Sequence, residues 1–170
     1  MNYQISYYSP EGHAEKMAIA LQKVLHCDSA LQNLTETRKA QADVQLVGFD
    51  FNQLDSESIP QLVRKYIRSL HGKTIFLFGT VPFKINDVVD RGINHMVYAA
   101  LPDKCDYRGF FLCSGQPSDK ILDYFQETFA KNQQNMRVSH WYKLCMHAIG
   151  HPNAADLENL CSFASHVLLP

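Results

Sequence analysis

Short apolar stretches alternate along this chain with segments whose apolar residues recur every three or four positions. The apolar stretches Tyr3–Tyr8, Val44–Phe49, Thr74–Gly79 and Tyr107–Cys113 predict strands, and a short, weak strand is expected at Ser29–Asn33. The stretch that begins at Thr74 is almost wholly apolar, which is typical of a strand buried on both faces of a parallel sheet.

Helical spacing marks the segments between and after these stretches. In the first of them the apolar residues form one buried face: Ala14, Met17, Ala18, Leu21, Val24 and Leu25. Further helices are predicted between Pro60 and Leu70, and over Asn86–Ala100, Ile121–Phe129 and Asp156–Val167. Residues 131–149 have the least clear pattern, and we expect a surface loop with a short helix packed across one edge of the sheet.

Strands that alternate with helices require right-handed crossovers, which produce a parallel sheet covered on both faces. The sequence therefore predicts an α/β fold: a doubly wound, five-stranded parallel sheet of order 2-1-3-4-5, with helices on both faces. The length of 170 residues suits one domain, and neither a repeat nor a linker divides residues 1–170.

Composition excludes several classes of protein. A net charge of −1 offers no electrostatic attraction for nucleic acid or for an acidic membrane surface. No apolar run approaches the ~20 residues of a membrane span, and the amino terminus has no secretory-signal pattern. The five cysteines are widely spaced, without a Cys-x-x-Cys pair, which argues against a disulfide framework or a zinc ribbon. We therefore expect a cytoplasmic protein with reduced thiols.

The turn after the first strand carries the clearest chemistry. Residues 9–14 join a strand to a helix through a short loop with one glycine, the layout that cradles phosphate at a helix N-terminus. This turn resembles the phosphate loop of flavodoxins, Ser/Thr-x-Thr-Gly-x-Thr followed by Glu-Lys-Met-Ala. Ser9, Gly12 and Glu15–Ala18 match that pattern, whereas Glu11 and Ala14 stand where the family has hydroxyl side chains.

Three later segments extend the resemblance over nearly the whole chain. Gly72–Thr80 resembles the fourth-strand segment of a short-chain flavodoxin subfamily, and Phe111–Gly115 resembles its Phe-x-Cys-x-Gly signature. His151–Asn153, followed by Asp156-Leu157, resembles the start of its final helix.

The resemblance implies a site for flavin mononucleotide (FMN) at the carboxyl ends of the strands. The first loop would hold the phosphate, loops 50–55 and 80–83 would flank the ring, and loop 113–116 would close its polar edge. The implied cofactor-binding residues are Ser9, Pro10, Glu11, Gly12, His13, Ala14, Asp50, Phe51, Asn52, Gly79, Thr80, Val81, Pro82, Phe83, Cys113, Ser114, Gly115 and Gln116.

Two departures bear on that site. Losing the hydroxyls at Glu11 and Ala14 removes hydrogen bonds to a charged group, each worth about 1.5–3 kcal/mol. Asp50 stands where the resembling proteins place a tryptophan, so we expect a carboxylate near the ring that opposes the anionic hydroquinone. Phe51 or Phe83 would then stack on the ring, or else both are ordinary core or rim residues.

The resemblance implies an FMN-binding electron carrier that serves a partner enzyme, with no catalytic residue of its own. A second interpretation is a flavodoxin-fold module that has lost FMN and acts through protein–protein contact, which Glu11 and Ala14 favour. The retained residues favour binding: Ser9, Gly12, Gly79-Thr80 and Ser114-Gly115. A third is a small flavin-dependent reductase of an organic substrate, for which the sequence shows neither a proton donor nor a substrate pocket.

Other reactive side chains have simpler interpretations. His147 and His151 are four apart, as a metal pair on a helix requires, but Gly150 and Pro152 interrupt a helix there, so we expect no metal site. Cys113 could be read as a nucleophile at the end of a strand, although a small buried thiol is the favoured reading.

Overall fold

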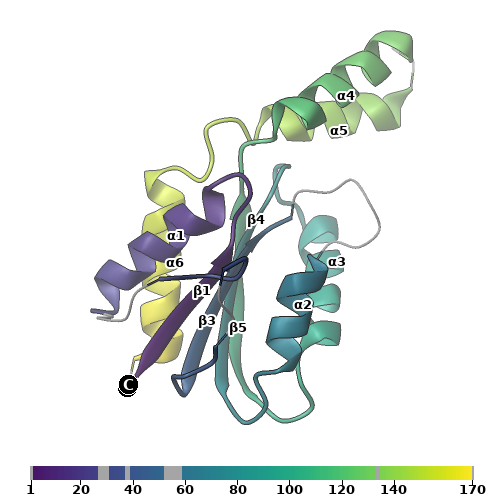
Figure 1. Cartoon of the computed structure of the whole chain (residues 1–170). Coiled ribbons are helices and arrows are strands. Elements are labelled where there is room, and N and C mark those ends of the chain that lie inside the picture. The colour runs from purple at the N-terminus through teal and green to yellow at the C-terminus, as the bar shows by residue number, and fades with distance from the viewer. Residues whose placement is uncertain (1, 27–30, 37–38, 52–58, 133–134, 170) are drawn as a thin grey trace.

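A five-stranded parallel sheet forms the centre of the structure, a computed structural model (Figure 1). The structure describes residues 2–26, 31–36, 39–51, 59–132 and 135–169. The strands are β1 (Tyr3–Tyr8), β2 (Gln32–Asn33), β3 (Val44–Asp50), β4 (Thr74–Val81) and β5 (Asp106–Ser114). Their order is β2-β1-β3-β4-β5, and every neighbouring pair is parallel, so the predicted fold class and strand order are confirmed.

The two most apolar strands lie side by side inside the sheet. All seven residues of β3 are buried, and the register pairs Val44 with Thr74 at one end and Asp50 with Thr80 at the other. Neither strand is at an edge, as the apolar runs predict. The pairing of Asp50 with Thr80 brings two polar side chains together where both strands end.

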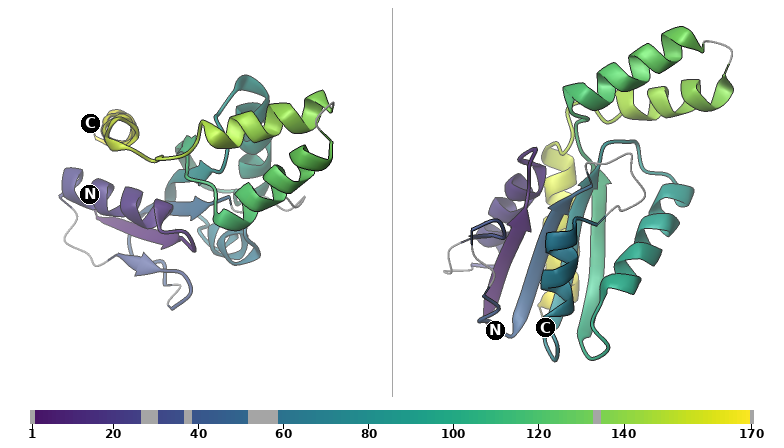
Figure 2. Two further views of the ribbon diagram at one scale, coloured as in Figure 1. Left: turned by 90° about the horizontal axis from the view of Figure 1, so that it is seen from above. Right: turned by 45° about the vertical axis from the view of Figure 1, so that its right-hand side comes forward.

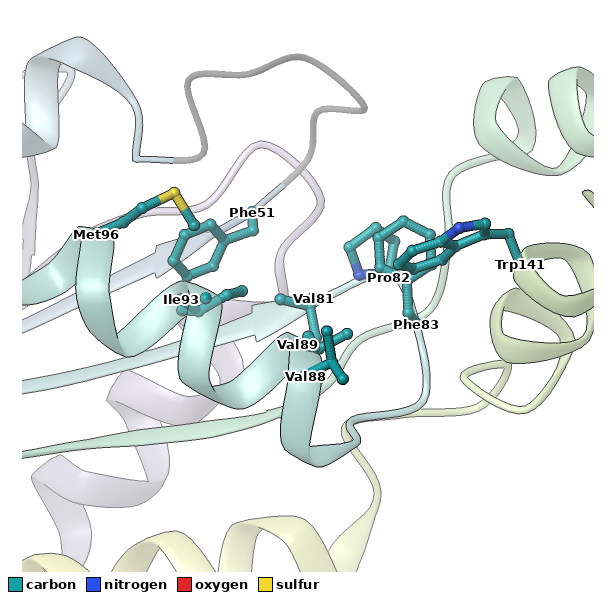
Figure 3. A pocket seen from close by; sticks show the side chains of 10 residues that line it. Phe51, Val81, Pro82, Phe83, Val88, Val89, Ile93, Met96 and Trp141 are labelled. Atoms are coloured by element: carbon teal, nitrogen blue, oxygen red, sulfur yellow. The ribbon is translucent and has the colours of Figure 1, made fainter. Parts of the chain in front are cut away.

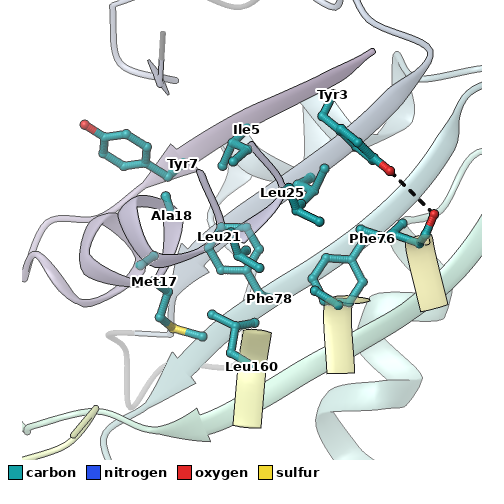
Figure 4. Packing of buried hydrophobic residues seen from close by; sticks show 14 of the residues in the cluster. Tyr3, Ile5, Tyr7, Met17, Ala18, Leu21, Leu25, Phe76, Phe78 and Leu160 are labelled. Atoms are coloured by element: carbon teal, nitrogen blue, oxygen red, sulfur yellow. Dashed lines mark hydrogen bonds between the residues drawn. The ribbon is translucent and has the colours of Figure 1, made fainter. Parts of the chain in front are cut away.

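Helices cover both faces of the sheet (Figures 1 and 2). One face is covered by α1 (His13–Val24) and α6 (Ala154–Leu168), and the other by α2 (Gln61–Arg68) and α3 (Asp87–Ala100). A separate apolar core lies on each face. Figure 4 shows the α1–α6 core, where Leu21, Phe78 and Leu160 meet. Burying a side chain of this size contributes roughly 1.5–3 kcal/mol, so these contacts fix α1 and its first turn on the sheet.

Side-chain caps explain where two of the helices begin. The Asn86 side chain accepts hydrogen bonds from the backbone N–H groups of Val88 and Val89, so Asn86 precedes α3 instead of being its first residue. Asn153 and Asp156 form a capping box at the start of α6. Each cap satisfies backbone donors that the helix itself leaves free.

A helical hairpin extends beyond the carboxyl edge of the sheet (Figures 1 and 2). It consists of α4 (Asp119–Lys131) and α5 (Met136–Met146), which pack against each other. From the sequence we expect a surface loop with a short helix across a sheet edge here, whereas α5 has 11 residues and pairs with α4. The reason is a small apolar cluster of its own, in which Cys145 packs with Ile121 and Phe125.

No helix in the part of the chain that the structure describes is long and apolar enough to cross a membrane.

Candidate functional site

The loops at the carboxyl edge of the sheet are tied together by hydrogen bonds. The backbone N–H of Phe51 donates to the carbonyl of Thr80 at 2.8 Å, and that of Gly115 donates to Val81 at 2.8 Å. His13 Nε2 lies 3.0 Å from the carbonyl oxygen of Gln116 and donates to it. The described residues of the four predicted loops therefore come together at this edge.

Asp50 is at the centre of this arrangement. Its Oδ2 accepts a hydrogen bond from Ser9 Oγ at 2.7 Å. Its Oδ1 accepts one from the backbone N–H of Ala14 at 2.8 Å and one from Thr80 Oγ1 at 3.0 Å. The residue is only 1% exposed. A buried carboxylate with three donors is well satisfied, since hydrogen bonds to a charged group are worth about 1.5–3 kcal/mol each.

The direction of the Asp50 side chain follows from strand periodicity. Strand β3 continues through Asp50, and successive side chains point to opposite faces. Phe49 and Phe51 pack in the α2–α3 core, so Asp50 between them faces α1. From the sequence we expect Asp50 to face the ring of a bound flavin. In the structure its carboxylate faces the first turn, because β3 extends one residue further than the apolar run.

Asp50 also caps helix α1. The N-cap residue of this helix is Gly12, at φ 80°, and no side chain of the turn caps the helix. The bond from the Ala14 N–H to Asp50 supplies a cap from another strand. Negative charge at a helix N-terminus is stabilising by about 0.3–1 kcal/mol, and by up to about 2 kcal/mol when partly buried. Among the residues that the structure describes, Asp50 has no ion-pair partner, so these donors alone offset its charge.

An apolar pocket of about 260 Å³ lies at the same edge, on the α3 side (Figure 3). It is lined by Phe51, Val81, Pro82, Phe83, Val88, Val89, Gly92, Ile93, Met96 and Trp141. Four of these are predicted site residues: Phe51, Val81, Pro82 and Phe83. Trp141 was missed because it comes from α5, far away in the sequence, and its ring centroid lies 5.0 Å from that of Phe83. That it is the one tryptophan in the chain was the available signal.

A second, more polar cleft of about 660 Å³ opens at the end of β5. Its polar or ionisable lining residues are Lys84, Cys113, Ser114, His147, His151, Asp156 and Asn159. Of these, Cys113 and Ser114 were predicted as site residues. His151 Nδ1 lies 2.6 Å from Asp156 Oδ2, which holds the imidazole ring in place. The motif around His151 therefore contributes to this cleft as well as to the start of α6.

The reactive side chains considered in the sequence analysis have structural explanations. Burial, followed by the nearby carboxylates of Asp156 and Asp50, raises the pKa of Cys113 to about 12. At neutral pH Cys113 is a buried thiol and not a thiolate nucleophile. No cluster of three or more His, Cys, Asp or Glu side chains able to hold a metal ion occurs within the described ranges, including the region of His147 and His151.

The remaining predicted residues are placed as follows. Pro10 and Glu11 are exposed at the tip of the first turn. Gly79 is buried within β4, where a Cβ atom would stand 2.5 Å from the carbonyl oxygen of Phe49. Asn52, with the rest of loop 52–55, lies outside the described residues. That these residues bind a flavin stays a prediction.

The first turn does not fit the phosphate of FMN as the resemblance implies. Ser9 Oγ and the Ala14 N–H are donors that such a phosphate would need, and both are bonded to Asp50. A doubly charged phosphate at this position would lie against a buried carboxylate, and like charges at short range in a poorly hydrated site repel strongly. The apolar pocket carries no such conflict, because its lining side chains are uncharged.

Comparison with known proteins gives a family and a fold. The family model described as "Flavodoxin domain" matches residues 4–165. No curated protein matches the sequence. Among solved structures, a Streptococcus pneumoniae flavodoxin is similar at a TM-score of 0.56 and 14% identity, covering 98% of this chain and 97% of that chain.

Two other solved structures show the same fold. A short-chain flavodoxin associated with a bacterial microcompartment has a TM-score of 0.52 and 15% identity, covering 98% of this chain and 97% of its own. Two-electron reduced Megasphaera elsdenii flavodoxin has a TM-score of 0.51 and 20% identity, covering 69% of this chain and 89% of its own.

Proposed function

Because this chain belongs to the flavodoxin domain family, we propose that it binds a flavin at the carboxyl edge of its sheet and exchanges electrons with a partner enzyme. The flavin ring supplies the redox chemistry when it is bound, and the protein supplies binding and the surroundings of the ring. The chain then acts as an electron carrier without a substrate of its own. The family resemblance implies FMN as this flavin. The conflict at the first turn concerns the phosphate of FMN and not its ring.

The apolar pocket beside β3 and β4 carries this proposal. Its volume of about 260 Å³ lies just below the ~300–1,000 Å³ that is typical of small-molecule sites. Aromatic surfaces come from three segments: Phe51 after β3, Phe83 after β4 and Trp141 on α5 (Figure 3). Phe83 and Trp141 meet edge to face at 66°, which leaves aromatic surface for a flat ligand. Two of its lining residues, Phe51 and Val81, directly follow Asp50 and Thr80 in the sequence. A ring held in this pocket would therefore lie beside the converging loops.

A cytoplasmic location is part of the proposal. The described cysteines Cys105, Cys113, Cys145 and Cys161 are all free. Free thiols, buried or partly buried, are typical of proteins in a reducing compartment.

The second candidate function is a flavodoxin-fold module that works without a flavin, through contact with another protein. One observation favours it: Asp50 takes the donors that would hold a phosphate, and it does so while 1% exposed. In this case the Asp50 bonds would only stabilise the turn, and the apolar pocket would have no flavin to hold.

Flavin titration distinguishes the two candidates. Apoprotein is titrated with riboflavin and with FMN, and binding is followed by the quenching of flavin fluorescence. The proposed carrier binds at least one of them, and its reduced complex is reoxidised by an added one-electron acceptor. Binding of neither flavin contradicts the carrier and leaves the interaction module.

Variants of the pocket locate the bound ring. We expect Phe83→Ala to weaken flavin binding about tenfold, because it removes an aromatic wall. Met136→Ala is the matched control, since Met136 is 86% exposed on α5, the helix that carries Trp141. Equal affinities for the wild type and Phe83→Ala would place the ring elsewhere.

A further inference from the structure

We propose that Asp50 is a built-in anion that occupies the phosphate turn, so that this chain selects a flavin without a terminal phosphate, of the riboflavin class, over FMN. The choice of flavin rests on the proposed function. The exclusion of phosphate from the turn rests on Asp50 and its surroundings, and it does not require a flavin.

The donors of the turn are already used. Ser9 Oγ, the Ala14 N–H and Thr80 Oγ1 all point to one carboxylate, at 2.7, 2.8 and 3.0 Å. They come from three elements, β1 with its loop, α1 and β4, and converge on the carboxylate as they would on an external anion. A carboxylate that accepts these bonds takes the place of an anionic ligand at the helix N-terminus.

Two basic side chains at the start of α1, Lys16 and His13, are bonded to backbone oxygens. Lys16 Nζ donates to the carbonyl oxygen of Pro152 at 2.6 Å, and His13 is bonded to the carbonyl of Gln116. Glu11 adds a further acidic side chain on the same turn. A phosphate would therefore enter a turn whose donors already hold the buried carboxylate of Asp50 and which carries a second acidic residue, Glu11.

A neutral ribityl chain avoids this conflict. It ends in a hydroxyl group, which can both donate and accept a hydrogen bond and carries no charge for Asp50 to repel. A phosphate accepts hydrogen bonds but brings two negative charges at neutral pH. The structure therefore predicts that the protein distinguishes riboflavin from FMN at the end of the ligand that is remote from the ring. The ring itself would contact the same pocket in both flavins.

The direct test compares the affinities of riboflavin and FMN for the wild-type protein under the same salt conditions. We expect riboflavin to bind at least about tenfold more tightly, a difference of about 1.4 kcal/mol. Asp50→Ser removes the charge and adds a hydroxyl, so it should reverse the preference in favour of FMN. Asp50→Asn removes the charge with little change of shape, and it should reduce the preference in the same direction if the serine variant does not fold.

Glu11→Gln is the matched control, because it removes one negative charge from the exposed part of the same turn. Its effect on the riboflavin-to-FMN ratio should be small and should disappear at high salt, since exposed charges are screened. The effect of Asp50→Ser should persist at high salt, because Asp50 is 1% exposed.

Inorganic phosphate tests the exclusion without any flavin. A ligand that binds only the folded protein raises its melting temperature. Millimolar phosphate, compared with chloride at equal ionic strength, should raise the melting temperature of Asp50→Ser and leave that of the wild type unchanged. An equal rise in both proteins would overturn the exclusion.

The outcomes separate the two claims. Tighter binding of FMN than of riboflavin by the wild type overturns the inference and leaves a flavin carrier standing. Binding of neither flavin by the wild type overturns the proposed function. In that case a gain of phosphate or FMN binding in Asp50→Ser still supports Asp50 as the built-in anion, and the lack of any gain contradicts it.

Discussion

The ring of Phe78 lies directly over Gly48, its partner on the neighbouring strand. A Cβ atom built on Gly48 would stand 2.2 Å from Cε2 of Phe78 and 2.3 Å from its Cζ. The Phe78 ring thereby fills the space between β3 and α1, within the core shown in Figure 4. Gly48 and Asp50 are two residues apart on β3, so the Phe78 ring over Gly48 and the bond of Asp50 to Ala14 lie on the same face of the sheet.

Gly48→Ala should lower the free energy of unfolding by about 1–3 kcal/mol, because the added methyl group forces Phe78 out of a packed core. Gly92→Ala is the control: Gly92 lies in α3, where a Cβ atom would have no neighbour within 4 Å. Alanine there should raise stability by about 0.5–1 kcal/mol, since glycine is unfavourable within a helix. Urea denaturation of both variants gives the two values, and equal effects at the two positions would contradict this account.

A buried polar network supports the other face of the sheet. Tyr66 Oη on α2 donates to Gln45 Oε1 at 3.0 Å and lies 3.2 Å from Ser6 Oγ. Tyr66→Phe should lower stability by about 1–3 kcal/mol, because it leaves buried polar groups without a partner. Tyr98→Phe, at a residue that is 61% exposed, should change little. Thermal and urea unfolding test this, and a Tyr66→Phe protein as stable as the wild type would show that water satisfies the network.

Much of the fold could be predicted because its signals are local. The runs at Val44–Phe49 and Thr74–Gly79 are typical of strands that are buried on both faces of a parallel sheet. Asn86 and Asn153 mark helix starts because their side chains cap backbone groups within the next three residues. The pairing of α5 with α4 was not predictable in this way. Its cluster is small, so few apolar positions in residues 131–149 reveal which face is buried.

The site was only partly predictable, because its central contacts join distant segments. The candidate cofactor-binding residues could be predicted, because they lie in the loops that follow the strands. The direction of the Asp50 side chain depends on where β3 ends. If the strand ended at Phe49, Asp50 would belong to the loop and could face a ring. Because the strand includes Asp50, its side chain points to the face of the sheet that α1 covers. Trp141 was missed because its contact with Phe83 joins distant segments, and only the folded hairpin brings the two side chains together.

The thiols should differ in reactivity according to their burial. Cys113 and Cys145 are buried, and burial raises the pKa of each to about 12, whereas Cys105 and Cys161 are partly exposed. Iodoacetamide at pH 8 should modify Cys105 and Cys161 first, and Cys113 and Cys145 only after denaturant is added. Mass spectrometry of the digested protein locates the label. Early labelling of Cys113 in the folded protein would contradict its placement against Met17.

The raised pKa of Cys113 also predicts how stability falls in alkali. The folded-state pKa of about 12 lies above the ordinary value of 9.0, chiefly because of burial, so the folded protein holds this proton more tightly than the unfolded chain does. Stability from this difference is fully present below pH 9 and is lost between pH 9 and pH 12. Cys113→Ala should therefore lose less stability than the wild type over that interval. Cys161→Ala, at a partly exposed position, is the control and should follow the wild type more closely. Unfolding by urea at several pH values measures the difference, and parallel curves for the wild type and Cys113→Ala would show that another group governs the alkaline loss.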